Sequence, residues 1–301
     1  MESIRMLLTV AAQEGWLVHH MDVKSAFPNG KLKEEVYVWQ PPGLSLQGTK
    51  GSFKWWASEH DMYMQGSAKL HVVVGIYVDD LIITGMNPAD IGAFKEEMCR
   101  LFWMSDLGLL SYYLRIEVKK GQNTITLGQA VYVKKLLEKA GMMACKPIST
   151  PMEVRLKLST KSTTPEVDVT MYRSLVGSLR YLVHTSPDIA FVVGYVSHFM
   201  EKPWQEHLVA VKHLLRYITG TVDYGIVYSK LLSGDNRLMS YSDSDWGGDA
   251  DEWRSTAGMI FFLGRLPVTW QYQKQKLVAL STYEAEYVAG VAGACQAMWL
   301  I

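Results

Sequence analysis

Apolar positions near the start of the chain repeat with two different periods. In residues 1–15 they fall on one helical stripe, which predicts an amphipathic helix. Residues 16–21 predict a strand that ends at Asp22. Residues 44–67 show no clear period, so no element is predicted there.

A β-hairpin is predicted around Asp79 and Asp80. Apolar runs at 70–78 and 81–85 flank this polar pair, and two polar residues between two apolar strands are a hairpin signal. The next helix is predicted to begin after Asn87, because the proline that follows it suits the first helical position.

The sequence pattern changes twice in the second half of the chain. Residues 145–170 are rich in Pro, Ser, Thr and Lys, and predict an exposed linker. Strands and helices are predicted on both sides of it, at 112–119, 124–127, 130–140, 171–184, 187–200 and 204–219. Three short strands follow, and a last helix begins at Ser281 with a capping box to Glu284. This order of elements predicts an α+β fold.

The bulk composition is that of an ordinary globular protein. Of the 301 residues 49% are hydrophobic and 20% are charged, which excludes a disordered or fibrous chain. The formal net charge is zero, so composition gives no support for a basic nucleic-acid-binding surface. Three widely spaced cysteines indicate neither a disulfide framework nor a zinc site, and favour an intracellular protein, cytoplasmic or nuclear. The apolar runs are too short to span a bilayer, so no membrane association is expected.

Three aspartates are candidates for a metal site. Nucleotidyl transfer with two divalent ions needs carboxylates held close together on rigid backbone. Asp79 and Asp80 at a hairpin tip, with Asp22 at a strand end, meet this need if the strands are neighbours in one sheet. Taken alone, each of them is more often an ordinary turn or cap residue.

The sequence around these aspartates resembles a known family, the reverse transcriptases of copia-type (LTR) retrotransposons. The segments that carry the resemblance are HHMDVKSAFPNGKLKEEVYVWQPPG and VGIYVDDLIITG. It implies that Asp22, Asp79 and Asp80 are catalytic and bind Mg²⁺, with Mn²⁺ as the alternative ion. It also implies that Tyr77 and Phe27 lie near the nucleotide, although a core aromatic is an equal reading of Phe27. The implied partners are an RNA template, a DNA primer and an RNA/DNA hybrid.

A second set of carboxylates lies near the end of the chain. Resemblance to the copia-type RNase H domain is carried by YSDSDWGGD and STYEAEY. It implies that Asp243 and Glu286 are catalytic metal ligands, with Asp245 as a weaker candidate. Helical spacing places Glu286, Gly290 and Gly293 on one face, which predicts a close approach to the sheet. A solvated surface position is the alternative for Glu286.

The chain departs from the family pattern at its ends and in its interior. Near residues 44–53 it lacks a segment that the family has between PPG and YVDD, which predicts an internal deletion. It begins without the family's fingers segment and stops before the later RNase H ligands. The resemblance implies five parts. They are a reverse-transcriptase palm remnant (1–86), the rest of the palm with a thumb-like region (87–144), a linker (145–170), a helical connection (171–232) and a partial RNase H-like fold (233–301).

Two functional hypotheses follow from these features. The first is the family role, RNA-directed DNA synthesis with RNase H activity. The second is a non-enzymatic transposon remnant with residual binding to nucleic acid or protein. The second is favoured, because metal ligands alone do not position template, primer and nucleotide. Both activities are therefore expected to be lost in this chain.

Overall fold

The computed structural model describes residues 1–24, 54–56, 59–65, 72–230 and 237–300. The chain divides into two compact units. The first consists of Met1–Ser111, Lys120–Ile125 and Tyr228–Leu232, and the second of Tyr112–Lys119, Thr126–Val227 and Ser233–Ile301. Both contain helices and antiparallel strands, which confirms the α+β class. Within the described ranges, no helix is long and apolar enough to cross a lipid bilayer.

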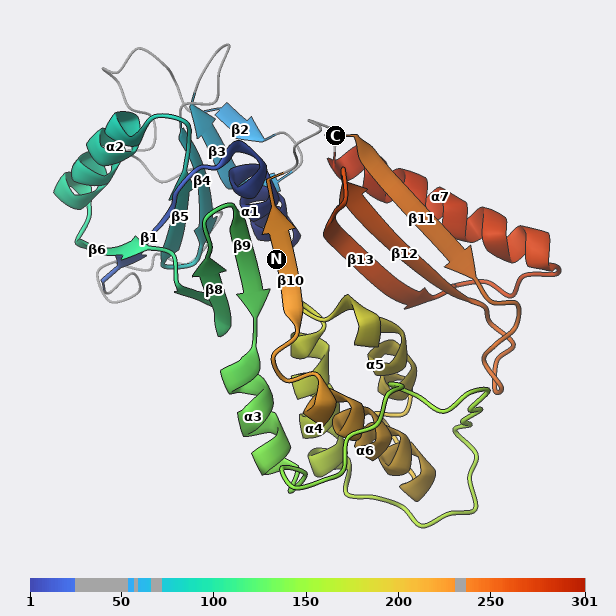
Figure 1. Cartoon of the computed structure of the whole chain (residues 1–301). Helices are drawn as coiled ribbons and strands as arrows, with labels where there is room; N and C mark the ends of the chain where they lie inside the picture. Colours follow the sequence, from blue (N-terminus) through green and yellow to red (C-terminus); the bar gives the residue numbers. More distant parts are fainter. Residues whose placement is uncertain (25–53, 57–58, 66–71, 231–236, 301) are drawn as a thin grey trace, which may run out of the picture. The chain divides into compact units, whose positions relative to one another are not determined.

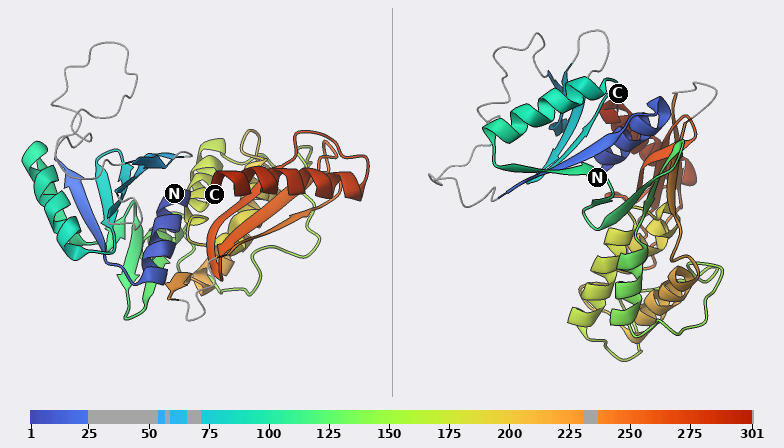
Figure 2. Two further views of the ribbon diagram at one scale, coloured as in Figure 1. Left: turned by 90° about the horizontal axis from the view of Figure 1, so that it is seen from above. Right: turned by 60° about the vertical axis from the view of Figure 1, so that its left-hand side comes forward.

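A six-stranded antiparallel sheet dominates the first unit, in the order β2-β3-β4-β5-β1-β6. Its strands are β1 (Val18–Val23), β2 (Lys54–Trp56), β3 (Glu59–Gln65), β4 (Val72–Tyr77), β5 (Asp80–Thr84) and β6 (Met104–Leu109). Helices α1 (Glu2–Glu14) and α2 (Pro88–Leu101) accompany it. Helix α2 lies along one face of the sheet (Figure 2) and buries Ile91, Phe94 and Met98 in the core of this unit.

Most elements of the first unit agree with the sequence pattern. The predicted start of α2 is confirmed, since the Asn87 side chain accepts a hydrogen bond from the Ala89 backbone N–H at 3.0 Å. Strands β2 and β3 fall in the stretch 44–67, where no element was predicted. β3 pairs with β4, whose valines are buried. This pairing favours the strand conformation of β3, which its own sequence does not predict.

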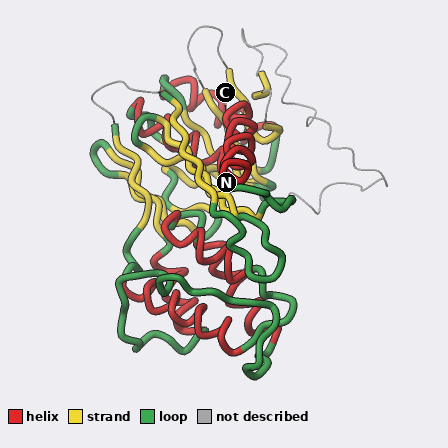
Figure 3. Tube along the Cα trace, turned by 90° about the vertical axis from the view of Figure 1, so that its right-hand side faces the viewer, coloured by secondary structure: helices red, strands yellow, loops and turns green. Residues whose placement is uncertain are grey.

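Helices make up a layer of the second unit, which Figure 3 shows free of strands. They are α3 (Ala130–Lys139), α4 (Val169–Leu182), the short 3₁₀ helix η1 (Pro187–Ile189), α5 (Ala190–Ser197) and α6 (Gln205–Gly220). The predicted helices are confirmed here, with ends shifted by a few residues. Their shared core includes Tyr172, Leu179, Val196, Leu214 and Leu215, all completely or almost completely buried.

The predicted linker 145–170 proves to be irregular but not wholly exposed. Leu158 is buried in the helical core, and its backbone N–H donates to the Tyr195 hydroxyl at 2.7 Å. The Ser159 carbonyl lies 3.0 Å from His207 Nε2 on α6. Most of the linker is polar, so its sequence gives little sign that single residues dock on the helices.

Acid is expected to destabilise the second unit through His207. This side chain is fully buried, its Nδ1 accepts from the Trp204 N–H at 3.0 Å, and its Nε2 therefore carries the proton. Burial lowers the pKa of His207, so the folded state holds the neutral ring and the unfolded state binds the proton more readily. The stabilisation is complete above the unfolded pKa, about 6.5, and is lost as pH falls below it.

Thermal unfolding at several pH values would measure this effect. The variant His207→Gln keeps a hydrogen-bonding side chain but does not titrate, so its melting temperature should depend less on pH between about 7.5 and 5.5. Identical pH dependence in the parent and the variant would show that His207 makes no contribution to the acid sensitivity.

Two further sheets are formed by the described residues. One has the order β10-β9-β8-β7, with β7 (Tyr112–Tyr113), β8 (Ile116–Lys120), β9 (Thr124–Gly128) and β10 (Gly225–Ser229). The other has the order β11-β12-β13, with β11 (Leu238–Ser244), β12 (Thr256–Leu263) and β13 (Leu266–Lys274). Helix α7 (Thr282–Leu300) covers one face of this last sheet (Figure 1). All three C-terminal strands and the final helix match the sequence prediction.

A stabilising substitution is predicted at Arg115, in the turn between β7 and β8. Both of its central residues have positive φ, 45° at Leu114 and 61° at Arg115. This backbone region is disfavoured for residues with a Cβ atom and open to glycine. Arg115→Gly is expected to raise the free energy of unfolding by about 0.5–1 kcal/mol. Urea unfolding measures it, and Lys119→Gly in the adjoining strand, expected to be destabilising, is the control.

Candidate functional site

Strand register brings two of the three predicted aspartates of the first unit together. β1 lies between β5 and β6, and its pairing with β5 sets Asp22 directly opposite Asp80. On the other side of β5, Asp80 is paired with Tyr77 of β4. Directly opposed residues project from the same face, with Cβ atoms about 4.5–5.5 Å apart. Asp22, Asp80 and Tyr77 therefore form one row across three neighbouring strands.

The turn of the β4–β5 hairpin positions Asp79. Val78 and Asp79 are its two central residues, and the Asp79 carbonyl accepts a hydrogen bond from the Val23 N–H at 2.8 Å. That bond ties the turn to the end of β1, next to Asp22. Val78 has a φ of 56°, which is unusual for a β-branched residue and costs energy. The three aspartates thus lie around one hairpin tip, with Asp79 at its turn and Asp80 beginning β5.

His20 belongs to this site, although the sequence reading did not select it. Its Nε2 lies 2.7 Å from Oδ1 of Asp80, in a half-buried contact. Because His20 precedes Asp22 by two residues in β1, strand alternation projects both from the same face. The period-2 pattern of β1 was a usable signal, but only the β1–β5 register reveals the partner. Phe27, the other residue predicted near the nucleotide, lies outside the described residues.

The donor set of this row suits a hard divalent cation. Magnesium prefers carboxylate oxygens and keeps several waters, so one or two protein carboxylates with substrate phosphates are sufficient. Asp22 and Asp80 supply two opposed carboxylates on a sheet, which is a rigid support. In the part of the chain that the structure describes, no group of three or more His, Cys, Asp or Glu residues is arranged to hold a metal ion. Asp22 and Asp80 therefore supply part of a coordination shell, and water or substrate phosphates would supply the rest.

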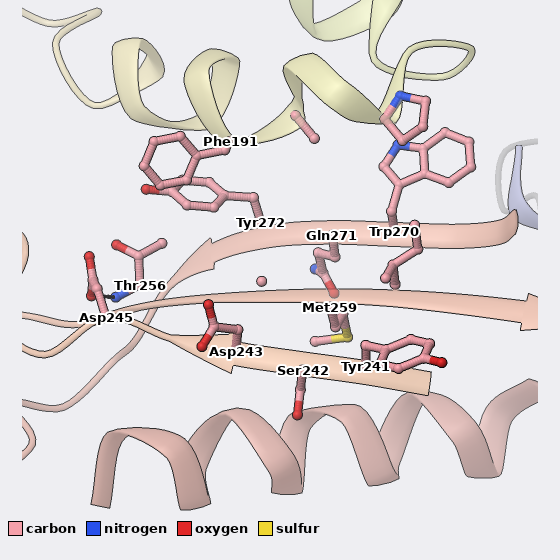
Figure 4. Close-up of a pocket in the computed structure, with 14 residues that line it drawn as sticks. Phe191, Tyr241, Ser242, Asp243, Asp245, Thr256, Met259, Trp270, Gln271 and Tyr272 are labelled. Atoms are coloured by element: carbon pink, nitrogen blue, oxygen red, sulfur yellow. Dashed lines mark hydrogen bonds between the residues drawn. The ribbon is translucent and has the colours of Figure 1, made fainter. Parts of the chain in front are cut away.

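The second pair of predicted ligands is not brought together. Ser242 of β11 faces α7. Its Cβ is close to Gly293 of that helix, since a Cβ added at Gly293 would lie only 3.9 Å from it. The next residue, Asp243, projects from the opposite face of the sheet (Figure 4). Glu286 is exposed on α7, which covers the face toward which Ser242 projects. Asp243 and Glu286 thus lie on different sides of the C-terminal sheet.

The small-residue face of α7 differs from the predicted one. Ala285, Ala289 and Gly293 are its buried positions, whereas Glu286 and Gly290 are exposed. The predicted face of Glu286, Gly290 and Gly293 was therefore wrong at two positions. The buried residues are Ala285 in place of Glu286 and Ala289 in place of Gly290. Several small residues in a row make α7 apolar nearly all round, so the sequence does not identify the side that packs.

The start of α7 agrees more closely with its prediction. The Glu284 N–H donates to the Ser281 hydroxyl at 3.2 Å, which confirms the serine cap. The Glu284 carboxylate accepts from the Leu280 N–H at 2.7 Å, one residue before the expected partner. Glu284 therefore has a local structural role, as its position in the sequence indicated.

A pocket of about 410 Å³ opens on the sheet face that carries Asp243. Residues of β11, β12 and β13 form its floor, and Phe191 of α5 lies over it (Figure 4). Asp245 lines one end, and its carboxylate accepts from the Thr256 N–H at 2.6 Å. Burial raises the pKa of Asp245 above its ordinary value. Asp245, the weaker candidate from sequence, therefore lies in the same pocket as Asp243.

Comparison with known proteins identifies the family. Residues 1–52 and 47–154 match the family model described as Reverse transcriptase (RNA-dependent DNA polymerase). The chain is 36% identical, over 99% of its length, to the retrovirus-related Pol polyprotein from transposon RE1 of Arabidopsis thaliana. It is 35% identical, over its whole length, to the corresponding polyprotein from transposon TNT 1-94 of Nicotiana tabacum. The chain belongs to the reverse transcriptase family, and its resemblance to copia-type retrotransposon polyproteins is confirmed.

Relatives of different length match this chain. It spans 22% of the RE1 polyprotein and 25% of the TNT 1-94 polyprotein. An uncharacterized mitochondrial protein of Arabidopsis thaliana is 35% identical to this chain. The match covers 92% of that protein and 74% of this chain. The RE1 alignment extends over 328 residues, more than the 301 of this chain, so RE1 has residues that this chain lacks. The two family-model matches meet at residues 47–52, inside the stretch where the deletion was predicted.

Proposed function

We propose that this chain is the palm, helical connection and RNase H-like portion of a copia-type Pol polyprotein. Its palm binds a divalent cation but does not by itself carry out RNA-directed DNA synthesis. The observation that carries this proposal is the β1–β5 register, which sets Asp22 opposite Asp80 beside the Asp79 turn. Without a cation, two opposed carboxylates destabilise the sheet, so a role in metal binding accounts for their placement.

Asp22 and Asp80 are the residues that would hold Mg²⁺ or Mn²⁺, with Asp79 in the turn beside them. When bound, such ions stabilise charge on the attacking and leaving oxygens of phosphoryl transfer. The protein contributes a rigid sheet that sets two carboxylates opposite each other, and a hairpin whose turn is bonded to the end of β1. His20 holds the Asp80 carboxylate through the 2.7 Å contact. Tyr77 is exposed at the end of the row, and its proposed partner is the nucleotide.

Loss of substrate positioning accounts for the proposed inactivity. In the family, the segment between PPG and YVDD helps to hold template and nucleotide. The RE1 alignment and the meeting of the two family matches near residue 50 support the absence of that segment here. Correct positioning of reactants is worth about 7–11 kcal/mol of an activation barrier, so bound metal alone gives no measurable synthesis.

RNase H cleavage is also proposed to be absent from this chain. Asp243 and Glu286, on different sides of the sheet, cannot share one ion in this arrangement. An RNA strand in an RNA/DNA hybrid is expected to stay intact on incubation with the protein and Mg²⁺. Cleavage that is abolished by Asp243→Asn would contradict this part of the proposal.

Primer extension on an RNA template is the direct test of the polymerase proposal. The purified chain is expected to add no nucleotides to a DNA primer with either Mg²⁺ or Mn²⁺, while an active reverse transcriptase extends it under the same conditions. The matched control is the Asp79→Asn/Asp80→Asn variant. Extension by the parent that is absent from this variant would show that the shortened palm still positions its substrates. Nucleic acids would then be confirmed as its partners.

A further inference from the structure

The pocket on the C-terminal sheet has walls of two chemical kinds. Its aromatic lining consists of Phe191, Tyr241, Trp270 and Tyr272. Its charged lining consists of Asp243 and Asp245, and no Lys, Arg or His is among the described residues that line it. An aromatic lining with negative charge and no basic side chain is complementary to a ligand that is both partly apolar and cationic.

The aromatic walls are fixed by their own contacts. The rings of Phe191 and Tyr272 meet edge to face, with centroids 4.9 Å apart. The Trp270 indole N–H donates to the Val183 carbonyl at 3.0 Å, so the ring is anchored to the end of α4. Tyr272 also packs directly over Gly194, where any side chain would collide with its ring. Phe191, Trp270 and Tyr272 are therefore in place before a ligand arrives, whereas Tyr241 is 62% exposed.

The two carboxylates have different environments. Asp245 is held by backbone N–H groups, including that of Thr256 at 2.6 Å. The Asp243 carboxylate has no hydrogen-bond or ion-pair partner among the described residues, and it points into the pocket between the aromatic walls and β11 (Figure 4). Its charge is thus available to a ligand.

We propose that this pocket binds an organic cation, a protonated alkylamine or a guanidinium group, with its charge at Asp243 and its apolar part against Phe191 and Tyr272. Cations of this kind gain from aromatic faces and from a carboxylate together. Hydrated Mg²⁺ is a poorer fit, because the Asp245 carboxylate already accepts a backbone hydrogen bond and much of the remaining lining is aromatic or aliphatic. The inference gives Asp243 a ligand other than the metal ion that the family resemblance implies. It is independent of the proposed metal site at Asp22 and Asp80.

Calorimetric titration of the full chain with a pair of matched probes tests this proposal. Butylguanidinium and butylurea have the same shape, but only the first is charged. Butylguanidinium is expected to bind at least about ten-fold more tightly, a difference that corresponds to one charged contact. Equal binding of the two probes, or no binding of either, would overturn the proposal. Displacement of butylguanidinium by an equal concentration of Mg²⁺ would also overturn it.

Variants locate the binding in the pocket. Asp243→Asn and Tyr272→Leu are each expected to weaken butylguanidinium binding at least about ten-fold, whereas Tyr272→Phe keeps the ring and should bind like the parent. Asp223→Asn, an exposed aspartate elsewhere in the second unit, is the control for nonspecific loss of charge. If Asp223→Asn weakens binding as much as Asp243→Asn does, the pocket is not the site. Thermal unfolding verifies that every variant is folded.

Two additional probes distinguish the sources of the cation. Spermidine represents a free polyamine, and a blocked Gly-Arg-Gly peptide represents an arginine side chain of a partner protein. Tighter binding of spermidine supports the pocket as a small-molecule site, and tighter binding of the peptide supports it as a docking site. Failure of both to compete with butylguanidinium would contradict the proposed ligand class.

Discussion

The affinity of this chain for Mn²⁺ is expected to fall by about 10- to 100-fold when Asp22 is replaced by asparagine. A loss of this size is typical even for a residue that only supports a metal ligand, and Asp22 is proposed to bind the ion directly. The substitution keeps the shape of the side chain and removes one of two opposed carboxylates. Asp80→Asn is expected to have a similar effect. Relaxation of water protons by Mn²⁺, titrated with protein, measures the affinity for the ion directly.

The free energy of unfolding of Asp22→Asn provides an independent test of the metal site. Without a divalent ion, Asp22→Asn relieves the repulsion from Asp80 and should raise the free energy of unfolding by up to about 0.5–1 kcal/mol. With saturating Mn²⁺, the parent should be the more stable protein, since the ion binds only its folded state. Glu96→Gln, an exposed charge removal on α2, should change neither quantity. Unchanged Mn²⁺ affinity in Asp22→Asn would exclude the row as the metal site.

Leu214→Ala is expected to lower the free energy of unfolding of the second unit by about 3–5 kcal/mol. Leu214 is fully buried at the centre of the helical core, so its truncation leaves a cavity lined by rigid neighbours. A loss of this size is a large fraction of the stability of a typical domain. Urea unfolding followed by far-ultraviolet circular dichroism measures it, and the large effect should appear as a lower midpoint with little change in slope.

The same helix contains a matched control for this prediction. Val209 lies on the solvent side of α6, with 53% of its surface exposed. Val209→Ala should change the free energy of unfolding by no more than about 0.5 kcal/mol. If Leu214→Ala is as mild as Val209→Ala, the α4–α6 core does not pack as the structure indicates.

Much of the fold could be predicted from local pattern. The caps at Asn87 and Ser281, the hairpin around Asp79, and the helices on either side of η1 all have signals within a few residues of the element. Strands β2 and β3 could not be predicted, because they lack an apolar period and depend on pairing with β4. The buried side of α7 was misplaced for a related reason, since its small residues surround the helix.

The candidate site divides in the same way. Sequence alone determined the class of fold and the family, and it supplied the candidate acidic residues, because residue type and order carry that information directly. Tertiary structure decided which of them meet. The β1–β5 register joins Asp22 to Asp80 and adds His20, and strand alternation in β11 turns Asp243 away from α7 and Glu286. A shift of one residue in either strand would reverse each of these results, because successive side chains of a strand point to opposite faces.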